Sequence, residues 1–494
     1  MLYLLKLSPE ITIKSRSVRQ QMTRCLATNV RNTLQHHAAH VRVKAGWDLI
    51  RVRLPEPLGD DEIRCLEAAL ARIPGIHEVQ AAELVPFISF TDTVRRVVPL
   101  WQEVIRDRRF RVRVKRRGRH AFSSEDLERH LGSALLTAAP GARVDLRHPD
   151  VEVPVSVVDD QLQLIRTRHP GAGGYPLGVQ GQALALVSGG FDSPVAAWRM
   201  MRRGVKTHFL FFNLGGAPHE AGVREVVHHL WRHHGASHHV RFVSVPFEGV
   251  VGEILRTIPD GLMGVVLKRM MVRAASRLAD TMRIPVLVTG DAIAQVSSQT
   301  LTNLGSIDAA SELPILRPLL TEDKQAIIDA ARRLDTARFA ERMPEYCGVI
   351  SRRPHVRARR RDIEAAEAGF DPAVLDAALE ASETTRVDRL RNQAPDPIEV
   401  RTVTSLATLV ALSSPCVIDI RPPAERDAAP LTLPRVAQLA IPFYELQDRA
   451  PTLPDDHEYL LYCDQGVMSR MQALHLADRG LTHFGIYRGP TPDA

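Results

Sequence analysis

Residues 184–204 read LALVSGGFDSPVAAWRMMRRG, and this stretch decides how the rest of the chain is interpreted. Its first four residues are apolar without polar alternation, which is typical of a buried parallel strand. A glycine-bearing turn, SGGFDS, follows, and apolar residues at helical spacing begin directly after it, with Pro194 suited to the first helical turn. A strand, a glycine turn and a helix aim backbone N–H groups at an anion, so the stretch predicts a phosphate-binding loop.

The residue types in the turn fit that chemistry. Gly189 and Gly190 have no Cβ and let the main chain approach an anion closely, while Ser188 and Ser193 add hydroxyl donors. Asp192 suits an anion site only if a divalent cation lies between it and the phosphates. The alternative is a plain strand-to-helix turn, because Gly-Gly and Asp-Ser are ordinary turn residues. The lysine of a Walker A loop is absent, and SGGFDS after an apolar strand instead resembles the PP-loop of ATP pyrophosphatases, which cleave ATP to AMP and pyrophosphate.

Length and composition predict a soluble protein with several domains. The chain has 494 residues, of which 45% are hydrophobic, enough for packed cores. We find no run of about eighteen apolar residues that could span a membrane, and the N-terminus lacks a signal-peptide pattern. A cytoplasmic location is therefore the expectation.

The cysteines and histidines favour neither a disulfide framework nor a metal site. The five cysteines are far apart and form no CxxC pair, so those that matter should act as thiols. The histidines between residues 228 and 239 are expected to lie on a solvated helix, because no second set of ligands opposes them. We therefore predict no metal held by protein ligands alone.

Beyond the glycine turn, strands and helices alternate along the chain. The apolar patterns predict strands at 206–213, 239–245 and 286–289, and helices at 220–233 and 262–279. This alternation predicts a doubly wound parallel sheet with ligands at the carboxyl ends of its strands. Residues 1–60 are instead expected to be α+β, and a smaller α/β unit is expected after a hinge at 392–397.

A strongly basic stretch precedes this region. The net charge is +7, and residues 95–120 carry many arginines against only two acidic residues. Within that stretch RFRVRVK alternates strictly, so a strand would bury Phe110 and expose cations on its other face. Its expected cationic residues are Arg109, Arg111, Arg113, Lys115, Arg116 and Arg117. A solvated sheet face is the alternative, but the scarcity of acidic partners favours RNA or DNA.

Two cysteines are candidate thiols. Cys463 follows an apolar strand and precedes a loop and a helix, an arrangement that stabilises a thiolate, and Arg470 adds positive charge. With Asp419-Ile420-Arg421 upstream, this loop resembles a rhodanese domain, although Asp464 places a carboxylate beside the cysteine. Cys347 lies between Pro344 and Gly348 on an expected loop, where a structural role is equally compatible.

Six motifs occur in the order KLSPEITIKS, SGGFDSPVA, TGDAIAQVSSQTLTNL, LRPL, MPEYCGVIS and YCDQGVMSR. Together they resemble the tRNA 4-thiouridine synthetase family (tRNA uracil 4-sulfurtransferases) over the full chain. The resemblance implies an N-terminal ferredoxin-like domain at 1–61, a THUMP RNA-binding domain at 62–168, a PP-loop ATP pyrophosphatase domain at 169–395 and a rhodanese-like α/β domain at 404–494.

The resemblance also implies a reaction. Uridine at tRNA position eight would be adenylated with ATP and Mg²⁺, with Asp192 in the catalytic loop. Cys463 would carry sulfur from a cysteine desulfurase as a persulfide, and Cys347 would attack it and form a disulfide. The nucleotide would be surrounded by Leu186, Val187, Ser188, Gly189, Gly190, Asp192, Ser193, Phe211, Phe212, Lys268, Gly290 and Gln299.

Other functions remain open from the sequence. The family also transfers sulfur to a sulfur carrier protein for thiamine thiazole synthesis. An enzyme acting on another tRNA position or only on a carrier protein would share the same loop, and so would a non-catalytic RNA-binding protein. The oligomeric state is not determined by the sequence, and a homodimer is compatible with it.

Overall fold

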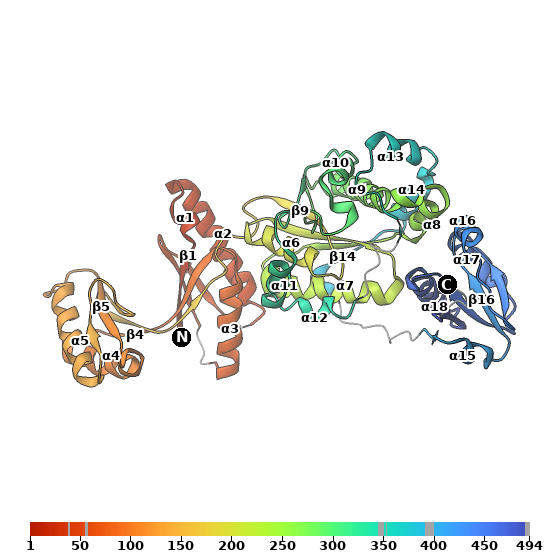
Figure 1. Ribbon diagram of the computed structural model, residues 1–494. Coiled ribbons are helices and arrows are strands. Elements are labelled where there is room, and N and C mark those ends of the chain that lie inside the picture. Colours follow the sequence, from red (N-terminus) through yellow and green to blue (C-terminus); the bar gives the residue numbers. More distant parts are fainter. Residues whose placement is uncertain (38–39, 55–57, 344–349, 352, 391–399, 490–494) are drawn as a thin grey trace. The chain divides into compact units, whose positions relative to one another are not determined.

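The computed structural model describes residues 1–37, 40–54, 58–343, 350–351, 353–390 and 400–489. The chain forms two compact units, one of residues 1–179 with 202–204 and one of residues 180–201 with 205–494 (Figure 1). Within the described ranges, no helix has the length and apolar character needed to cross a membrane.

The first unit is built on an eight-stranded sheet with the order β2-β3-β1-β4-β8-β7-β5-β6. Its first half runs β1 (Leu2–Leu7), α2 (Arg16–Leu34), β2 (Arg42–Ala45), β3 (Leu49–Arg53), α3 (Asp60–Arg72) and β4 (Ile76–Pro86). This βαββαβ succession with the strand order β4-β1-β3-β2 confirms the expected ferredoxin-like topology. The predicted domain boundary after residue 61 falls inside α3 and stays a prediction.

The second half of the same sheet carries the basic strand. It contains α4 (Phe90–Ile105), β5 (Arg109–Arg117), α5 (Ser124–Ala138), β6 (Arg143–Val144), β7 (Val151–Val158) and β8 (Gln161–Pro170). The long strands β4 and β8 pair from Glu78↔Pro170 to Pro86↔Gln161 and so join the two halves. Figure 1 shows α2 and α3 beside one half and α4 and α5 beside the other. In β5 the predicted alternation is confirmed, because Phe110, Val112 and Val114 are buried.

The second unit begins with a six-stranded sheet. Its strands are β9 (Gln182–Leu186), β10 (Lys206–Asn213), β11 (Arg241–Pro246), β12 (Leu287–Val288), β13 (Ile315–Leu316) and β14 (Glu383–Arg386). Five of them are parallel in the order β13-β12-β9-β10-β11, and β14 adds an antiparallel edge. Figure 1 shows helices on both faces, among them α6 (Asp192–Arg202), α7 (Gly216–Leu230) and α9 (Met263–Met282). The predicted doubly wound sheet is confirmed.

The C-terminal part of the second unit has its own five-stranded parallel sheet, ordered β15-β19-β18-β16-β17. The strands are β15 (Thr402–Val403), β16 (Pro415–Asp419), β17 (Ala437–Ala440), β18 (Glu458–Tyr462) and β19 (Phe484–Tyr487). Alternate residues of the central strands face opposite cores: Ile418 and Leu461 pack in one, and Val417 and Leu460 in the other. The rhodanese-like assignment of this α/β fold stays a prediction.

Phe110 offers a test of the core beneath the basic strand. Phe110→Ala should destabilise this half of the first unit by about 3–5 kcal/mol, because the fully buried ring would leave a cavity. Lys115→Ala, on the exposed face of the same strand, should change stability by less than about 0.5 kcal/mol. Amide hydrogen exchange of β5 and α5 measures this local stability in the whole chain. Equal protection in both variants would contradict the inward orientation of Phe110.

Candidate functional site

The glycine turn closes on itself through its two serines. It lies between the end of β9 and the start of α6. The backbone N–H of Ser188 donates to Ser193 Oγ at 2.8 Å, and that hydroxyl lies 3.2 Å from the Ser188 carbonyl oxygen. The turn is thereby fixed as a loop at the N-terminus of α6, the position at which an anion is stabilised by backbone N–H groups and the helix dipole.

This loop lies at the switch point of the sheet. The chain proceeds from β9 to β10 and β11 on one side and later to β12 and β13 on the other. Ligands of doubly wound folds bind at such a point, beyond the carboxyl ends of the strands. Gly290, two residues beyond β12, approaches the loop so closely that a Cβ there would lie 2.8 Å from the backbone nitrogen of Ser193. The structure therefore brings the predicted Gly290 to the predicted phosphate loop.

One side of the loop is covered by a methionine that the sequence did not indicate. A Cβ at Gly189 would collide with the Met343 thioether, and one at Gly222 of α7 would lie 2.8 Å from the same sulfur. Gly190 differs, because a Cβ there would find its nearest neighbour, Ser188 Oγ, only at 3.7 Å. The open side of the loop is therefore at Gly190. Cys347, four residues after Met343, lies outside the described residues.

Asp192 is held by two side chains that sequence reasoning missed. Lys324 Nζ, at the start of α11 (Lys324–Arg333), lies 3.0 Å from Asp192 Oδ1, and Gln295 Nε2 donates to Oδ2 at 2.9 Å. Among the described residues no group of three or more His, Cys, Asp or Glu side chains could hold a metal ion. A lone carboxylate still fits Mg²⁺, which commonly binds one or two protein carboxylates together with substrate phosphates.

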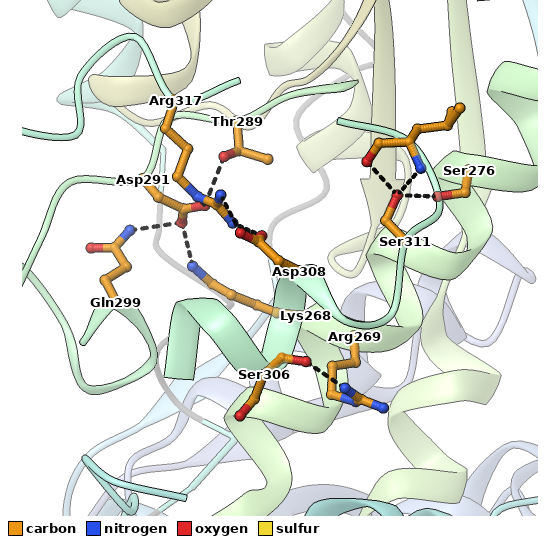
Figure 2. Close-up of polar contacts among 11 residues, drawn as sticks. Lys268, Arg269, Ser276, Thr289, Asp291, Gln299, Ser306, Asp308, Ser311 and Arg317 are labelled. Carbon is orange, nitrogen blue, oxygen red and sulfur yellow. Dashed lines mark hydrogen bonds and ion pairs between the residues drawn. The ribbon is translucent and has the colours of Figure 1, made fainter. Parts of the chain in front are cut away.

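The Asp291 carboxylate accepts hydrogen bonds from four side chains of the site (Figure 2). Its Oδ1 accepts from Lys268 Nζ at 2.7 Å and Gln299 Nε2 at 3.0 Å, and its Oδ2 from Thr289 Oγ1 at 2.7 Å and Arg317 Nε at 3.3 Å. Burial alone would raise the pKa of Asp291, but Lys268 and the hydrogen bonds outweigh it and hold the pKa well below its usual range. The carboxylate thus fixes the two predicted side chains, Lys268 and Gln299, in one network.

Arg317 and Asp291 were missed although a signal for both was present. Arg317 directly follows the parallel strand β13, and Asp291 lies shortly after the parallel strand β12. Polar residues at such strand ends meet at one edge of the sheet. Arg317 also pairs with Asp308 of α10 (Leu301–Asp308), at 2.5 Å, so two carboxylates face the two cations of this network. The charges therefore balance before any ligand binds.

The remaining predicted nucleotide residues lie at neighbouring strand ends. Leu186 is the last residue of β9 and Val187 follows it, and Phe211 and Phe212 lie near the end of β10. The Phe211 and Phe212 rings are buried, Phe211 against His219 at 4.7 Å between ring centroids. Because their rings are buried, these two phenylalanines can contact a ligand only through their main-chain N–H and C=O groups. Burial lowers the pKa of His219 to about 4, so the imidazole beside them is neutral at physiological pH.

The histidine-rich segment differs from its prediction. His229 is buried rather than solvated, and its Nε2 lies 3.0 Å from the Leu334 carbonyl oxygen. The helix winds into a π-helical turn at Trp231–Gly235 instead of continuing as an α-helix. His229 therefore belongs to the core packing, whereas His239 at the end of the segment is exposed.

Cys463 directly follows β18, in the loop before α18 (Val467–Asp478). The backbone N–H of Ser469 donates to Cys463 Sγ at 3.3 Å, and Gly466 before the helix adopts a left-handed conformation with φ of +69°. The sulfur therefore lies at the N-terminus of α18, within reach of a backbone N–H donor. The predicted geometry around this cysteine is therefore present.

The carboxylate of Asp464 is compensated. Arg421, which is buried, forms a 2.6 Å ion pair with Asp419 and a 3.0 Å ion pair with Asp464 Oδ1. Tyr462 also donates its hydroxyl to that oxygen at 3.2 Å. The negative charge of Asp464 is thus partly neutralised, and by Arg421 rather than by the exposed Arg470.

On the basic strand the expected lack of acidic partners is wrong for two residues. Arg109 pairs with Asp150 at 2.9 Å and Arg111 with Glu152 at 2.5 Å. Strand β7, which runs parallel beside β5, contains Glu152 and is directly preceded by Asp150. In the part of the chain that the structure describes, no carboxylate lies within 4.0 Å of the cations of Arg113, Lys115, Arg116 or Arg117.

Two family models match parts of the chain. A family model described as Thiamine biosynthesis protein (ThiI) matches residues 178–371, and one for the THUMP domain matches residues 93–165. A crystal structure of a 4-thiouridine synthetase–RNA complex with bound ATP superposes with a TM-score of 0.67 and 25% identity. It covers 78% of this chain and 99% of that one.

Curated relatives extend the match to nearly the whole chain. The tRNA sulfurtransferase of Edwardsiella ictaluri is 47% identical over 489 residues, which is 99% of this chain and 100% of that protein. The tRNA sulfurtransferase of Klebsiella pneumoniae strain 342 is 46% identical over the same shares. Matched at this identity from end to end, the chain belongs to the tRNA sulfurtransferase family.

Proposed function

We propose that this protein is an ATP-dependent enzyme that adenylates uridine eight of tRNA and replaces its O4 with sulfur, giving 4-thiouridine. The observation that carries the proposal is the meeting of the glycine loop with the Gly290–Asp291 turn at the switch point of the sheet. Relatives of this chain are named tRNA sulfurtransferases, and the structural neighbour holds both RNA and ATP.

The loop and its surrounding cations suit adenylation. Uridine O4 attacks the α-phosphorus of ATP, and the bond to pyrophosphate breaks. The N–H groups at the N-terminus of α6 and the ammonium groups of Lys268 and Lys324 stabilise charge that develops on the leaving pyrophosphate. Mg²⁺, held by Asp192, would further neutralise the phosphates when bound. The oxygen of the base thereby becomes part of AMP, a good leaving group.

Cys463 supplies the replacing atom. A cysteine desulfurase transfers sulfane sulfur to its thiolate, which becomes a persulfide. The Cys347 thiolate then attacks Cys463 Sγ, hydrosulfide leaves toward C4 of the adenylated uridine, and AMP departs. A Cys347–Cys463 disulfide remains, and a thiol reductant reopens it. The Ser469 N–H at the N-terminus of α18 is placed to donate to the Cys463 sulfur during these steps.

Unpaired cations of β5 suit the tRNA. Arg113, Lys115 and Arg117 project from the face opposite to Phe110, and Arg116 lies over the ring of Phe122 at 5.4 Å. A row of cations at strand spacing matches a phosphate backbone. The reaction takes place in the cytoplasm, where tRNA and ATP are available.

A second acceptor is favoured by the description of the matched family. The family model over residues 178–371 is named for thiamine biosynthesis. The persulfide on Cys463 therefore also serves a sulfur carrier protein for thiazole synthesis.

Thiazole formation should depend on Cys463 in an extract that makes this product. Continued thiazole formation in an extract of a Cys463→Ser strain would remove the second acceptor.

The direct test uses the whole chain with unmodified tRNA, ATP, Mg²⁺, cysteine and a cysteine desulfurase. Mass spectrometry of digested tRNA should find 4-thiouridine at position eight, and only when ATP is present. Cys463→Ser should abolish the product while tRNA affinity is unchanged, because the variant lacks only the sulfur carrier. Cys65→Ser, at an exposed thiol in the first unit, is the matched control and should thiolate normally. Thiolation by Cys463→Ser would refute the persulfide role.

Asp291→Asn tests whether the carboxylate network orients the nucleotide-binding side chains. ATP affinity should fall at least about tenfold, because a hydrogen bond to a charged group contributes about 1.5–3 kcal/mol and Lys268 would lose its partner. In a Lys268→Met background the same change should have little further effect.

The control for this variant is another buried ion pair on α9. Arg269 Nε pairs with Glu367 Oε1 at 2.6 Å, and both side chains are at most 8% exposed. Glu367→Gln should lower the melting temperature as Asp291→Asn does but leave ATP affinity within twofold. Calorimetric titration with ATP separates the two. Equal losses of affinity would show that Asp291 acts only through stability.

A further inference from the structure

We propose that residues 353–359 form a second RNA-contact surface, on the unit that carries the phosphate loop, where they bind the sugar–phosphate backbone of tRNA. This inference rests on the proposed function, because uridine O4 must reach the nucleotide before it can be adenylated. The segment reads RPHVRAR and follows Cys347 in the sequence.

Its cations are free to bind a partner. Arg353, Arg357 and Arg359 are exposed. Within the described ranges of the chain, no carboxylate lies within 4.0 Å of their guanidinium groups. The next two arginines differ, since Arg360 pairs with Glu364 and Arg361 with Asp362. Three uncompensated positive charges therefore lie within seven residues.

The backbone of the segment is fixed, although it contains no helix or strand. Asn303 of α10, which is completely buried, donates from Nδ2 to the His355 carbonyl oxygen at 2.8 Å and accepts from the backbone N–H of Ala358 at 3.0 Å. The His355 N–H donates to the Gly261 carbonyl at 2.8 Å, and the Arg353 N–H to Asp260 Oδ2 at 2.9 Å. The arginines therefore project from a preorganised backbone, which lowers the entropy lost on binding.

The same contacts fasten the segment to the nucleotide site. Asn303 Nδ2 also donates to the Ser297 carbonyl oxygen at 2.8 Å, in the turn that carries Gln299. Thr300 Oγ1, one residue after Gln299, donates to the Val356 carbonyl oxygen at 2.6 Å. A polyanion bound along the segment would consequently be held beside the wall of the site at which Gln299 binds Asp291.

The surface next to these cations is apolar in part. Val356, between the arginines, is 54% exposed, and Leu301 at the start of α10 is 68% exposed. Cations with apolar side chains between them suit a nucleic acid, which offers phosphates and the faces of unstacked bases. An acidic protein would share the charge, but the position beside Gln299 favours the acceptor substrate.

The test is the salt dependence of tRNA binding by the full chain. Arg353, Arg357 and Arg359 are all changed to Gln, and affinity for unmodified tRNA is measured over a series of salt concentrations. The slope of log K against log salt should become shallower by about two to three, since each lost phosphate contact contributes about 0.7–0.9. ATP affinity and the melting temperature should be unchanged.

A matched variant removes the same three charges from the same unit. Arg277, Arg332 and Arg338 are exposed but paired with Asp376, Asp329 and Asp335. Changing these three arginines to Gln should leave the slope of log K against log salt within about 0.5 of the wild-type value. An unchanged slope in the first variant, or an equal loss in the control, would overturn the proposal. Failure of the wild-type chain to thiolate tRNA would instead remove the proposed function and leave the binding result to stand.

Discussion

A buried carboxylate must be paired, and Asp291 meets that constraint with the groups that surround the nucleotide site. Isolated in the interior, its charge would be strongly unfavourable. Its four donors come from α9, from the turn before α10 and from the ends of β12 and β13. Removing the carboxylate would leave Lys268 and Arg317 without a shared partner. The same contacts therefore stabilise the fold at this edge of the sheet and orient its polar side chains.

Features that depend on neighbouring residues could be predicted from the sequence. The loop after β9 was visible because an apolar run, a glycine pair and a helical pattern are contiguous, and the alternation of β5 because its period is two. Contacts between distant residues could not be predicted. Lys324 reaches Asp192 across 132 positions, and nothing near Met343 indicated that it would cover Gly189. Such contacts are set by tertiary packing, which cannot be predicted from the pattern of a single sequence.

The basic strand shows why counting charges along a chain misleads. Asp150 and Glu152 lie 41 residues after the arginines that they pair with, outside the stretch whose acidic residues were counted. The parallel register of β5 and β7 places Arg111 opposite Glu152 and Arg113 opposite Pro154. Whether an arginine on this face is neutralised is thus decided by its cross-strand neighbour. The same reasoning applies to Asp464, because Arg421, which partly neutralises its charge, lies 43 positions away in the sequence.

Two kinds of cation with different physical roles can therefore be distinguished in the chain. Lys268, Arg317 and Arg421 have carboxylate partners in partly or fully buried surroundings, where low polarity strengthens each interaction, and they shape sites. Arg113 and Arg357 are exposed, and each lies on a backbone that is already fixed. Charges of the second kind lose little on meeting a polyanion, because they give up no existing ion pair and release counterions from it. The net charge of +7 thus favours a polyanionic partner through exposed cations of this second kind.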